Sequence, residues 1–207
     1  SSSKIYDVII VGAGPSGAAL ARILGRERSV LLLEGRCLGT AEDAAGPAAE
    51  KCCGGLLAPD AAKVLARAGL SLPPGIIVGE QPLTVRAVDL ASGHERSYPR
   101  TYINMRRLEF ERWLLSLLPE GATVRGGSRC LEARQELKGR EMLWRVRTST
   151  GENYTGRLLV GADGANSFVR RAVLRQKPKR EHVYLAVQDA WPLSEACRGR
   201  EEYLALF

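Results

Sequence analysis

The stretch IYDVIIVGAGPSGAALARILG, residues 5–25, decides the fold. Its first seven residues are rich in Val and Ile, which is typical of a strand buried on both faces of a parallel sheet. Residues 12–17 follow at once and fit the pattern G-x-G-x-x-G, and residues 18–24 predict a helix that ends at Gly25. Strand, glycine-rich turn and helix come in the order that begins a dinucleotide-binding βαβ unit.

Each glycine of this turn has a physical role. Gly12 allows the tight turn, Gly14 lets the backbone approach a pyrophosphate, and Gly17 lets the helix pack closely on the strand. The N-terminus of the helix then directs unpaired N–H groups at the diphosphate. The residues predicted to contact a dinucleotide within residues 12–17 are Gly12, Gly14, Pro15, Ser16 and Gly17.

A second strand is predicted over residues 29–33, and it ends at Glu34. An acidic side chain about 20 residues after the first glycine accepts hydrogen bonds from ribose hydroxyls, and it favours a ribose without a phosphate. We include Gly35 and Arg36, which follow directly, in the predicted cofactor-binding set. The motif does not distinguish NAD from FAD.

Composition excludes several classes of protein. The 207 residues are 45% hydrophobic and 26% charged, which is ordinary for a globular chain, and the net charge is +7. The basic residues are spread along the chain, and no nucleic-acid-binding motif accompanies them, so we expect no nucleic-acid partner. Five scattered cysteines and two histidines predict neither a disulfide framework nor a metal site. Chemistry would then depend on an organic cofactor.

Apolar runs are short, and the first residues lack the apolar region of a secretory signal, so we expect no transmembrane helix and a cytoplasmic protein. Six cations between Arg170 and Arg180 predict either a solvated surface or contact with an anionic membrane or a prenyl diphosphate. The substrate pocket and the oligomeric state cannot be inferred from these residues.

The middle of the chain does not continue as a plain NAD domain would. Residues 36–82 are rich in Gly, Ala and Pro, with one predicted helix near residues 59–68. Residues 83–90 and 95–98 predict an antiparallel hairpin. Asn104 is predicted to cap a helix that runs to about Leu118.

Three short strands without a crossover helix are predicted between residues 123 and 160. Residues 157–160 predict a further buried strand, and Gly161-Ala162-Asp163-Gly164-Ala165-Asn166-Ser167 leads from it to a helix that starts at Phe168.

This last element, with Arg170, resembles the G-A-D-G-x-x-S-x-x-R segment of FAD-dependent oxidoreductases of the p-hydroxybenzoate-hydroxylase type. The resemblance implies that FAD is the cofactor, and that Asp163 and Gly164 lie near its diphosphate and ribityl chain. Residues 107–114 match the R-x-x-F-[DE]-x-x-L helix of that family, which implies that Arg107 lies near the diphosphate. An exposed surface arginine is the alternative for Arg107.

Residues 51–57, KCCGGLL, and residues 102–105 resemble the geranylgeranyl-reductase branch of the superfamily. Members of this branch reduce carbon–carbon double bonds of isoprenoid chains. The resemblance implies that Cys53 and Gly54 lie near the isoalloxazine ring, with Cys53 as the candidate catalytic residue. The alternative for Cys53 is an unreactive small side chain in a glycine-rich loop.

The expected fold is α/β: a Rossmann-like FAD-binding domain with a parallel sheet and an antiparallel β insertion, followed by the start of a β-rich substrate domain. We assign residues 1–82 and 101–180 to the FAD-binding domain, 83–100 to the inserted hairpin, and 181–207 to the substrate domain. The third motif expected for the family is absent, so the chain is expected to be truncated.

The expected function is hydride transfer from reduced FAD to an apolar, unsaturated isoprenoid substrate, with NADPH or NADH as electron donor. One alternative is a flavin-dependent monooxygenase that hydroxylates an aromatic or polyketide substrate. A second alternative is a nucleotide-binding fragment without turnover.

Overall fold

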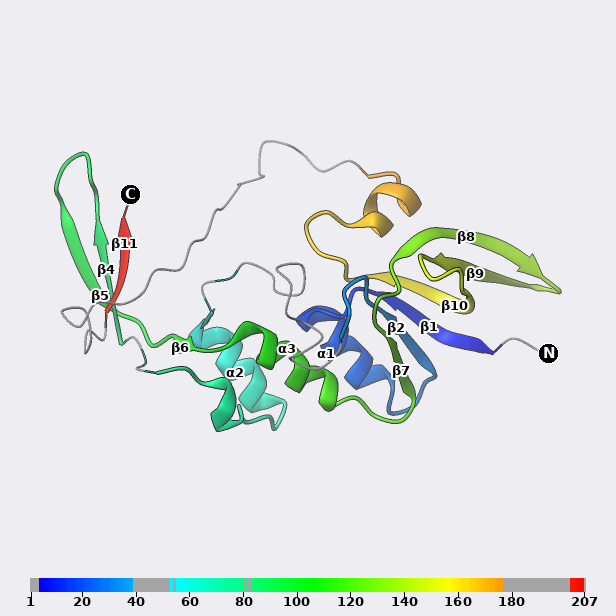
Figure 1. The fold of residues 1–207 in the computed structure, drawn as a ribbon, viewed down its shortest axis with the longest axis horizontal. Coiled ribbons are helices and arrows are strands. Elements are labelled where there is room, and N and C mark those ends of the chain that lie inside the picture. The colour runs from blue at the N-terminus through cyan, green and yellow to red at the C-terminus, as the bar shows by residue number, and fades with distance from the viewer. Residues whose placement is uncertain are drawn as a thin grey trace. The chain divides into compact units, whose positions relative to one another are not determined.

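The computed structural model describes residues 4–38, 53, 55–79, 81 and 83–176, and the backbone of 202–206 (Figure 1). The chain divides into two compact units, each described here by itself. Unit 1 comprises Ser1–Glu50 and Glu111–Tyr184, and unit 2 comprises Lys51–Phe110 and Leu185–Phe207.

Unit 1 is built on a six-stranded sheet with the strand order β7-β2-β1-β10-β9-β8. Neighbours among the first four strands are parallel, and β9 and β8 continue the sheet in antiparallel pairing. The strands are β1 (Ile5–Val11), β2 (Val30–Leu33), β7 (Ala122–Arg125), β8 (Cys130–Lys138), β9 (Glu141–Thr148) and β10 (Asn153–Gly161).

The core of unit 1 lies on both faces of β1 and β2. Ile9, Ile10, Leu31 and Leu32 have no exposed surface. Helix α1 (Pro15–Leu24) covers one face, where its Ala21 packs in a cluster with apolar side chains of both strands. This confirms the buried strand, glycine turn, helix and second strand predicted for residues 5–33.

Two predictions for residues 122–161 were wrong. The first of the three strands predicted from residue 123 does not pair with the strand that follows it, because β7 pairs with β2 in parallel. Residues 157–160 are not a separate strand but the second half of β10, whose first half pairs with β9. One long strand therefore serves both the parallel and the antiparallel parts of the sheet. After it, residues Val169–Val173 form a short π-helical turn, η2.

Unit 2 contains two small sheets. In one, β3 (Leu56–Leu57) pairs with β6 (Ile103–Asn104) in antiparallel orientation. In the other, β4 (Thr84–Val88) and β5 (Glu95–Pro99) form the expected hairpin, and β11 (Glu202–Leu206) pairs with β4 in parallel. Its remaining elements are α2 (Pro59–Arg67) and the 3₁₀ turn η1 (Pro74–Ile76).

The helix predicted from Asn104 begins later. Helix α3 spans Arg107–Ser116, and the division between the units falls within it. Asn104 is not its cap, because it lies in β6, and its backbone N–H donates to the side-chain oxygen of Gln81 at 2.7 Å. A remote pairing has overridden the local capping signal. The predicted start of the substrate domain, residues 181–207, lies outside the described residues except for the backbone of 202–206.

Candidate functional site

The two glycine-containing motifs meet at the carboxyl ends of neighbouring parallel strands. Val11 at the end of β1 is in register with Gly161 at the end of β10. The N–H of Ala162 donates to the carbonyl of Val11 at 2.7 Å, which places the turn after β10 directly beside the turn after β1. Ligands of open α/β sheets bind at this end of the strands.

Gly12 and Gly17 are required by close backbone contacts. Gly12 has a φ of +103°, and a Cβ there would lie 2.4 Å from the carbonyl oxygen of Ala162. A Cβ on Gly17 would lie 1.9 Å from the carbonyl oxygen of Gly12. The first contact joins the two motifs, and the second seats α1 against the turn that precedes it.

Among the described residues, no side chain caps the N-terminus of α1 with a hydrogen bond. Gly14 is the N-cap residue and provides no capping side chain, Pro15 is in the first turn, and that turn contains no acidic residue. The first N–H groups of a helix have no partner within the helix. Together with the positive end of the helix dipole, they suit an anionic group such as a diphosphate.

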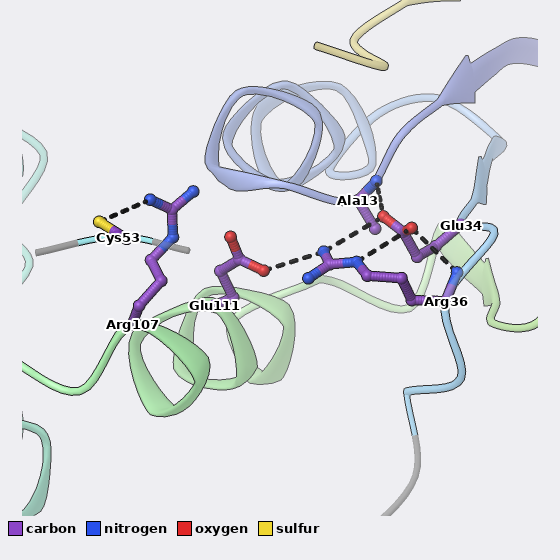
Figure 2. Close-up of polar contacts among 6 residues, drawn as sticks. All are labelled: Ala13, Glu34, Arg36, Cys53, Arg107 and Glu111. Carbon is purple, nitrogen blue, oxygen red and sulfur yellow. Dashed lines mark hydrogen bonds and ion pairs between the residues drawn. The ribbon is translucent and has the colours of Figure 1, made fainter. Parts of the chain in front are cut away.

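Glu34 links the end of β2 to the glycine-rich turn (Figure 2). It is 8% exposed, and its Oε2 accepts a hydrogen bond from the N–H of Ala13 at 2.9 Å. Its Oε1 accepts from the backbone N–H of Arg36 at 3.0 Å and from Nε of Arg36 at 3.2 Å. The carboxylate is thus held at the edge of the turn by donors from both sides.

Arg36 also contacts a second acid. Its Nη2 lies 2.9 Å from Oε2 of Glu111 on α3, a residue that is 4% exposed. Burial works to raise the pKa of Glu34, but hydrogen bonds from Arg36 and Ala13 outweigh it and hold that pKa below its ordinary value. Burial works to lower the pKa of Arg36, and its two carboxylate partners raise it. Glu34 and Arg36 are therefore both charged at neutral pH.

Asp163 organises the second motif from within. Its Oδ1 accepts from the hydroxyl of Ser167 at 2.5 Å, and its Oδ2 accepts from the N–H groups of Phe168 and Val169 at 2.5 and 3.1 Å. The guanidinium of Arg170 donates to the carbonyl of Ala165 across the same loop. Gly164, with a φ of +78°, has no atom within 4 Å of a would-be Cβ and leaves this turn open.

Of the other predicted residues, Ser16 and Gly35 lie in unit 1, and Cys53, Gly54 and Arg107 belong to unit 2. Nη1 of Arg107 is 3.5 Å from the sulfur of Cys53 (Figure 2). The β3–β6 pairing brings these two segments together, and the carbonyl of Gly55 accepts from the N–H of Met105 at 2.7 Å. Cys52 and Gly54 lie outside the described residues.

The described residues include no helix long and apolar enough to span a membrane.

The thiol of Cys130 is buried in the core of unit 1. Burial, with the nearby charge of Asp163, raises the pKa of this thiol to about 11, so the side chain is protonated at neutral pH.

Comparison with known proteins gives the family context. No protein-family model matches. "Protein CbrA" of Escherichia coli (strain K12) and that of Shigella sonnei (strain Ss046) are each 39% identical over 184 residues, which is 89% of this chain and 50% of the relative. The chain therefore spans about half the length of these curated relatives.

Solved structures agree on the fold. PqsL from Pseudomonas aeruginosa, "a probable FAD-dependent monooxygenase", matches with a TM-score of 0.61 and 23% identity over 85% of this chain and 47% of its own. A geranylgeranyl bacteriochlorophyll reductase-like protein from Thermoplasma acidophilum matches with a TM-score of 0.59 and 20% identity over 79% and 40%. The chain shares the fold of these two solved structures over less than half of their length.

The residues of unit 1 fit the ADP part of FAD. The turn after β1 is kept free of side chains by Gly12 and Gly17, the N-terminus of α1 is uncapped, and a buried carboxylate stands at the end of β2. These are the donors and acceptors that a diphosphate and a ribose need. The sequence analysis predicted Glu34 and Arg36 but not Glu111. The contact of Glu111 with Arg36 spans 75 residues, and only the acidic position of the R-x-x-F-E segment hinted at it.

Proposed function

We propose that the protein is an FAD-dependent oxidoreductase, and that unit 1 of this chain holds the ADP part of the cofactor. The observation that carries the proposal is the meeting of two motifs, far apart in sequence, at the carboxyl ends of β1 and β10. A tight glycine turn alone occurs in many α/β proteins, whereas here both motifs lie side by side at the carboxyl ends of adjacent parallel strands.

In this proposal the backbone around Gly14 and the first turn of α1 bind the diphosphate, and Glu34 accepts from the ribose hydroxyls. Gly164 allows close approach of the second turn, while Asp163 keeps that turn in shape. Arg107 is assigned to a phosphate by resemblance only. FAD, when bound, supplies the redox chemistry, and the chain binds, orients and desolvates it.

For the reaction, we favour reduction of a carbon–carbon double bond of an apolar, isoprenoid-type substrate, with NADPH or NADH as donor. The KCCGGLL segment supports this, and the contact between Cys53 and Arg107 places a thiol next to a cation in unit 2. The reductase-like structural neighbour also supports it. A monooxygenase reaction is the second candidate, which the similarity to PqsL favours equally.

Two measurements test these statements on the protein made from its complete gene. The absorption spectrum and the mass of the released cofactor test FAD binding, and a preparation that holds no flavin and takes up none would refute the proposal. For the reaction, reduced enzyme is mixed with a prenylated substrate without oxygen. Saturation of the chain supports the reductase, whereas oxygen consumption that depends on an aromatic substrate supports the monooxygenase.

A further inference from the structure

One arginine and two carboxylates form a buried charged cluster in unit 1. The side chains of Glu34, Arg36 and Glu111 are 10%, 16% and 5% exposed. Burying a charge is costly unless it is paired, and removing one member of such a cluster leaves another uncompensated. Two acids contact one guanidinium here, and Glu111 binds Nη2, the nitrogen that would complete a two-point pair with Glu34.

The geometry of the guanidinium shows how these contacts differ. Nε of Arg36 lies 3.2 Å from Oε1 of Glu34, but its Nη2 lies 3.4 Å from Oε2 of Glu34 and 2.9 Å from Glu111. In a complete two-point pair between an arginine and a carboxylate, both N–O distances are about 2.8 Å. Nη2 is therefore shared by the two acids and lies nearer to Glu111 than to Glu34; Figure 2 draws both contacts.

This geometry affects which hydrogen bonds Oε2 of Glu34 can accept. Its short hydrogen bond is to the N–H of Ala13 in the glycine-rich turn, at 2.9 Å. The second lone pair of Oε2 accepts the longer bond from Nη2 of Arg36, at 3.4 Å, so a hydroxyl group of a ligand has only this weaker bond to displace. If Nη2 moved closer to Oε2, the guanidinium would compete for that oxygen with the N–H of Ala13 and with any hydroxyl group of a ligand.

We propose that Glu111 is a positioning residue for the cofactor: it holds Arg36 back from a complete pair with Glu34, so that Glu34 keeps an acceptor for the adenosine ribose. This inference rests on the proposed function. It also gives a reason for the acidic residue in the R-x-x-F-E segment of α3, which acts through Arg36 and not on the cofactor itself.

The first test is Glu111→Gln in the protein made from its complete gene. The dissociation constants of FAD and of FMN for the apoprotein are measured by flavin fluorescence. We expect FAD to bind about tenfold more weakly, the scale of one charge-assisted hydrogen bond. FMN lacks the adenosine and should bind unchanged. Glu120→Gln, at an exposed position after α3, is the matched control and should change neither constant.

An equal loss of FAD and FMN affinity would mean that Glu111 only supports the fold, and would overturn the proposal. Should Glu111→Gln fail to fold, Glu111→Asp keeps the charge but shortens the side chain. The same contrast then applies: weaker FAD binding with unchanged FMN binding supports the proposal, and equal losses refute it.

The second test asks whether Glu111 acts through Arg36. In an Arg36→Gln background Glu111 can no longer act on the guanidinium, so Glu111→Gln should leave FAD affinity unchanged. A loss as large as in the wild-type background would refute the mechanism. Glu34→Gln separates the two proposals: if it leaves FAD affinity unchanged, the ribose site itself is wrong, whereas an effect of Glu34→Gln without one of Glu111→Gln refutes only the positioning role.

Discussion

Replacement of Gly17 by alanine tests whether the close contact between α1 and the glycine turn holds the site together. The added Cβ would lie 1.9 Å from the carbonyl oxygen of Gly12, well inside the 3.0 Å that real Cβ atoms respect. Both groups belong to the backbone, so the overlap of about 1 Å can be relieved only by moving α1 away from the turn. Overpacking of a core by flexible side chains costs about 1–3 kcal/mol. We therefore expect Gly17→Ala to lower the free energy of unfolding by about 3 kcal/mol.

The assay is urea unfolding followed by circular dichroism, with FAD affinity measured in parallel. Gly75→Ala is the matched control, because a Cβ there meets no atom within 4 Å and its φ is not positive. It should be neutral or slightly stabilising. The same shift of α1 should weaken FAD binding, since the N–H groups of its first turn move with it. If the two variants unfold within about 0.5 kcal/mol of each other, the close-packing argument is refuted.

Three further predictions follow from hydrogen bonds and pKa values. The folded-state pKa of Glu34 is lowered, so its ionised carboxylate stabilises the fold above pH 4.5, the ordinary pKa, and this stabilisation is lost as the pH falls through the folded pKa. In urea unfolding, the stability of Glu34→Gln should therefore depend less on acid pH than that of the wild type. Equal slopes of unfolding free energy against pH would contradict this prediction. The pKa of Cys130 is raised from 9.0 to about 11, so its protonated thiol contributes fully to folding stability below pH 9.0, and this contribution is lost as the pH rises through about 11. At pH 8 a thiol reagent should modify Cys130 far more slowly than the exposed Cys37. Equal rates would show that Cys130 is accessible. Asp163→Ala should lower the free energy of unfolding by about 2 kcal/mol, because three donors lose their acceptor. The control Asp60→Ala, at an exposed site, should change it by less than about 0.5 kcal/mol. Similar losses in the two variants would argue against the loop role of Asp163.

The parts of the fold that sequence predicted well depend on neighbours in the chain. The strand, turn and helix over residues 5–25 are encoded by hydrophobic pattern, glycine spacing and a terminal glycine, all within one short window. Where a partner is remote, local signals failed. Asn104 has the residue type of a helix cap but pairs with Leu56, and the strand at 122–125 gave no local sign that it would pair with β2.

The candidate site divides in the same way. The glycines and Glu34 belong to a motif whose spacing can be read within one short stretch of sequence, so they could be named as candidates without the structure. The contact of Arg36 with Glu111 spans 75 residues, and that of Arg107 with Cys53 spans 54. Residue type alone does not reveal such pairs, because many exposed arginines and acids along the chain would satisfy the same description.

The positions of Glu34 and Asp163 affect how readily an anionic group can bind at this end of the sheet. Glu34 and Asp163 both stand at the carboxyl ends of strands, where an unshielded negative charge would repel a diphosphate. Each is instead engaged by donors of its own unit: Glu34 by Ala13 and Arg36, and Asp163 by Ser167 and the N–H groups that follow it. The N-terminus of α1 has no side-chain cap and no acidic residue in its first turn, so its N–H groups and helix dipole favour an anion. Under the proposed function, the two acids hold the turns in shape and the backbone N–H groups bind the phosphates.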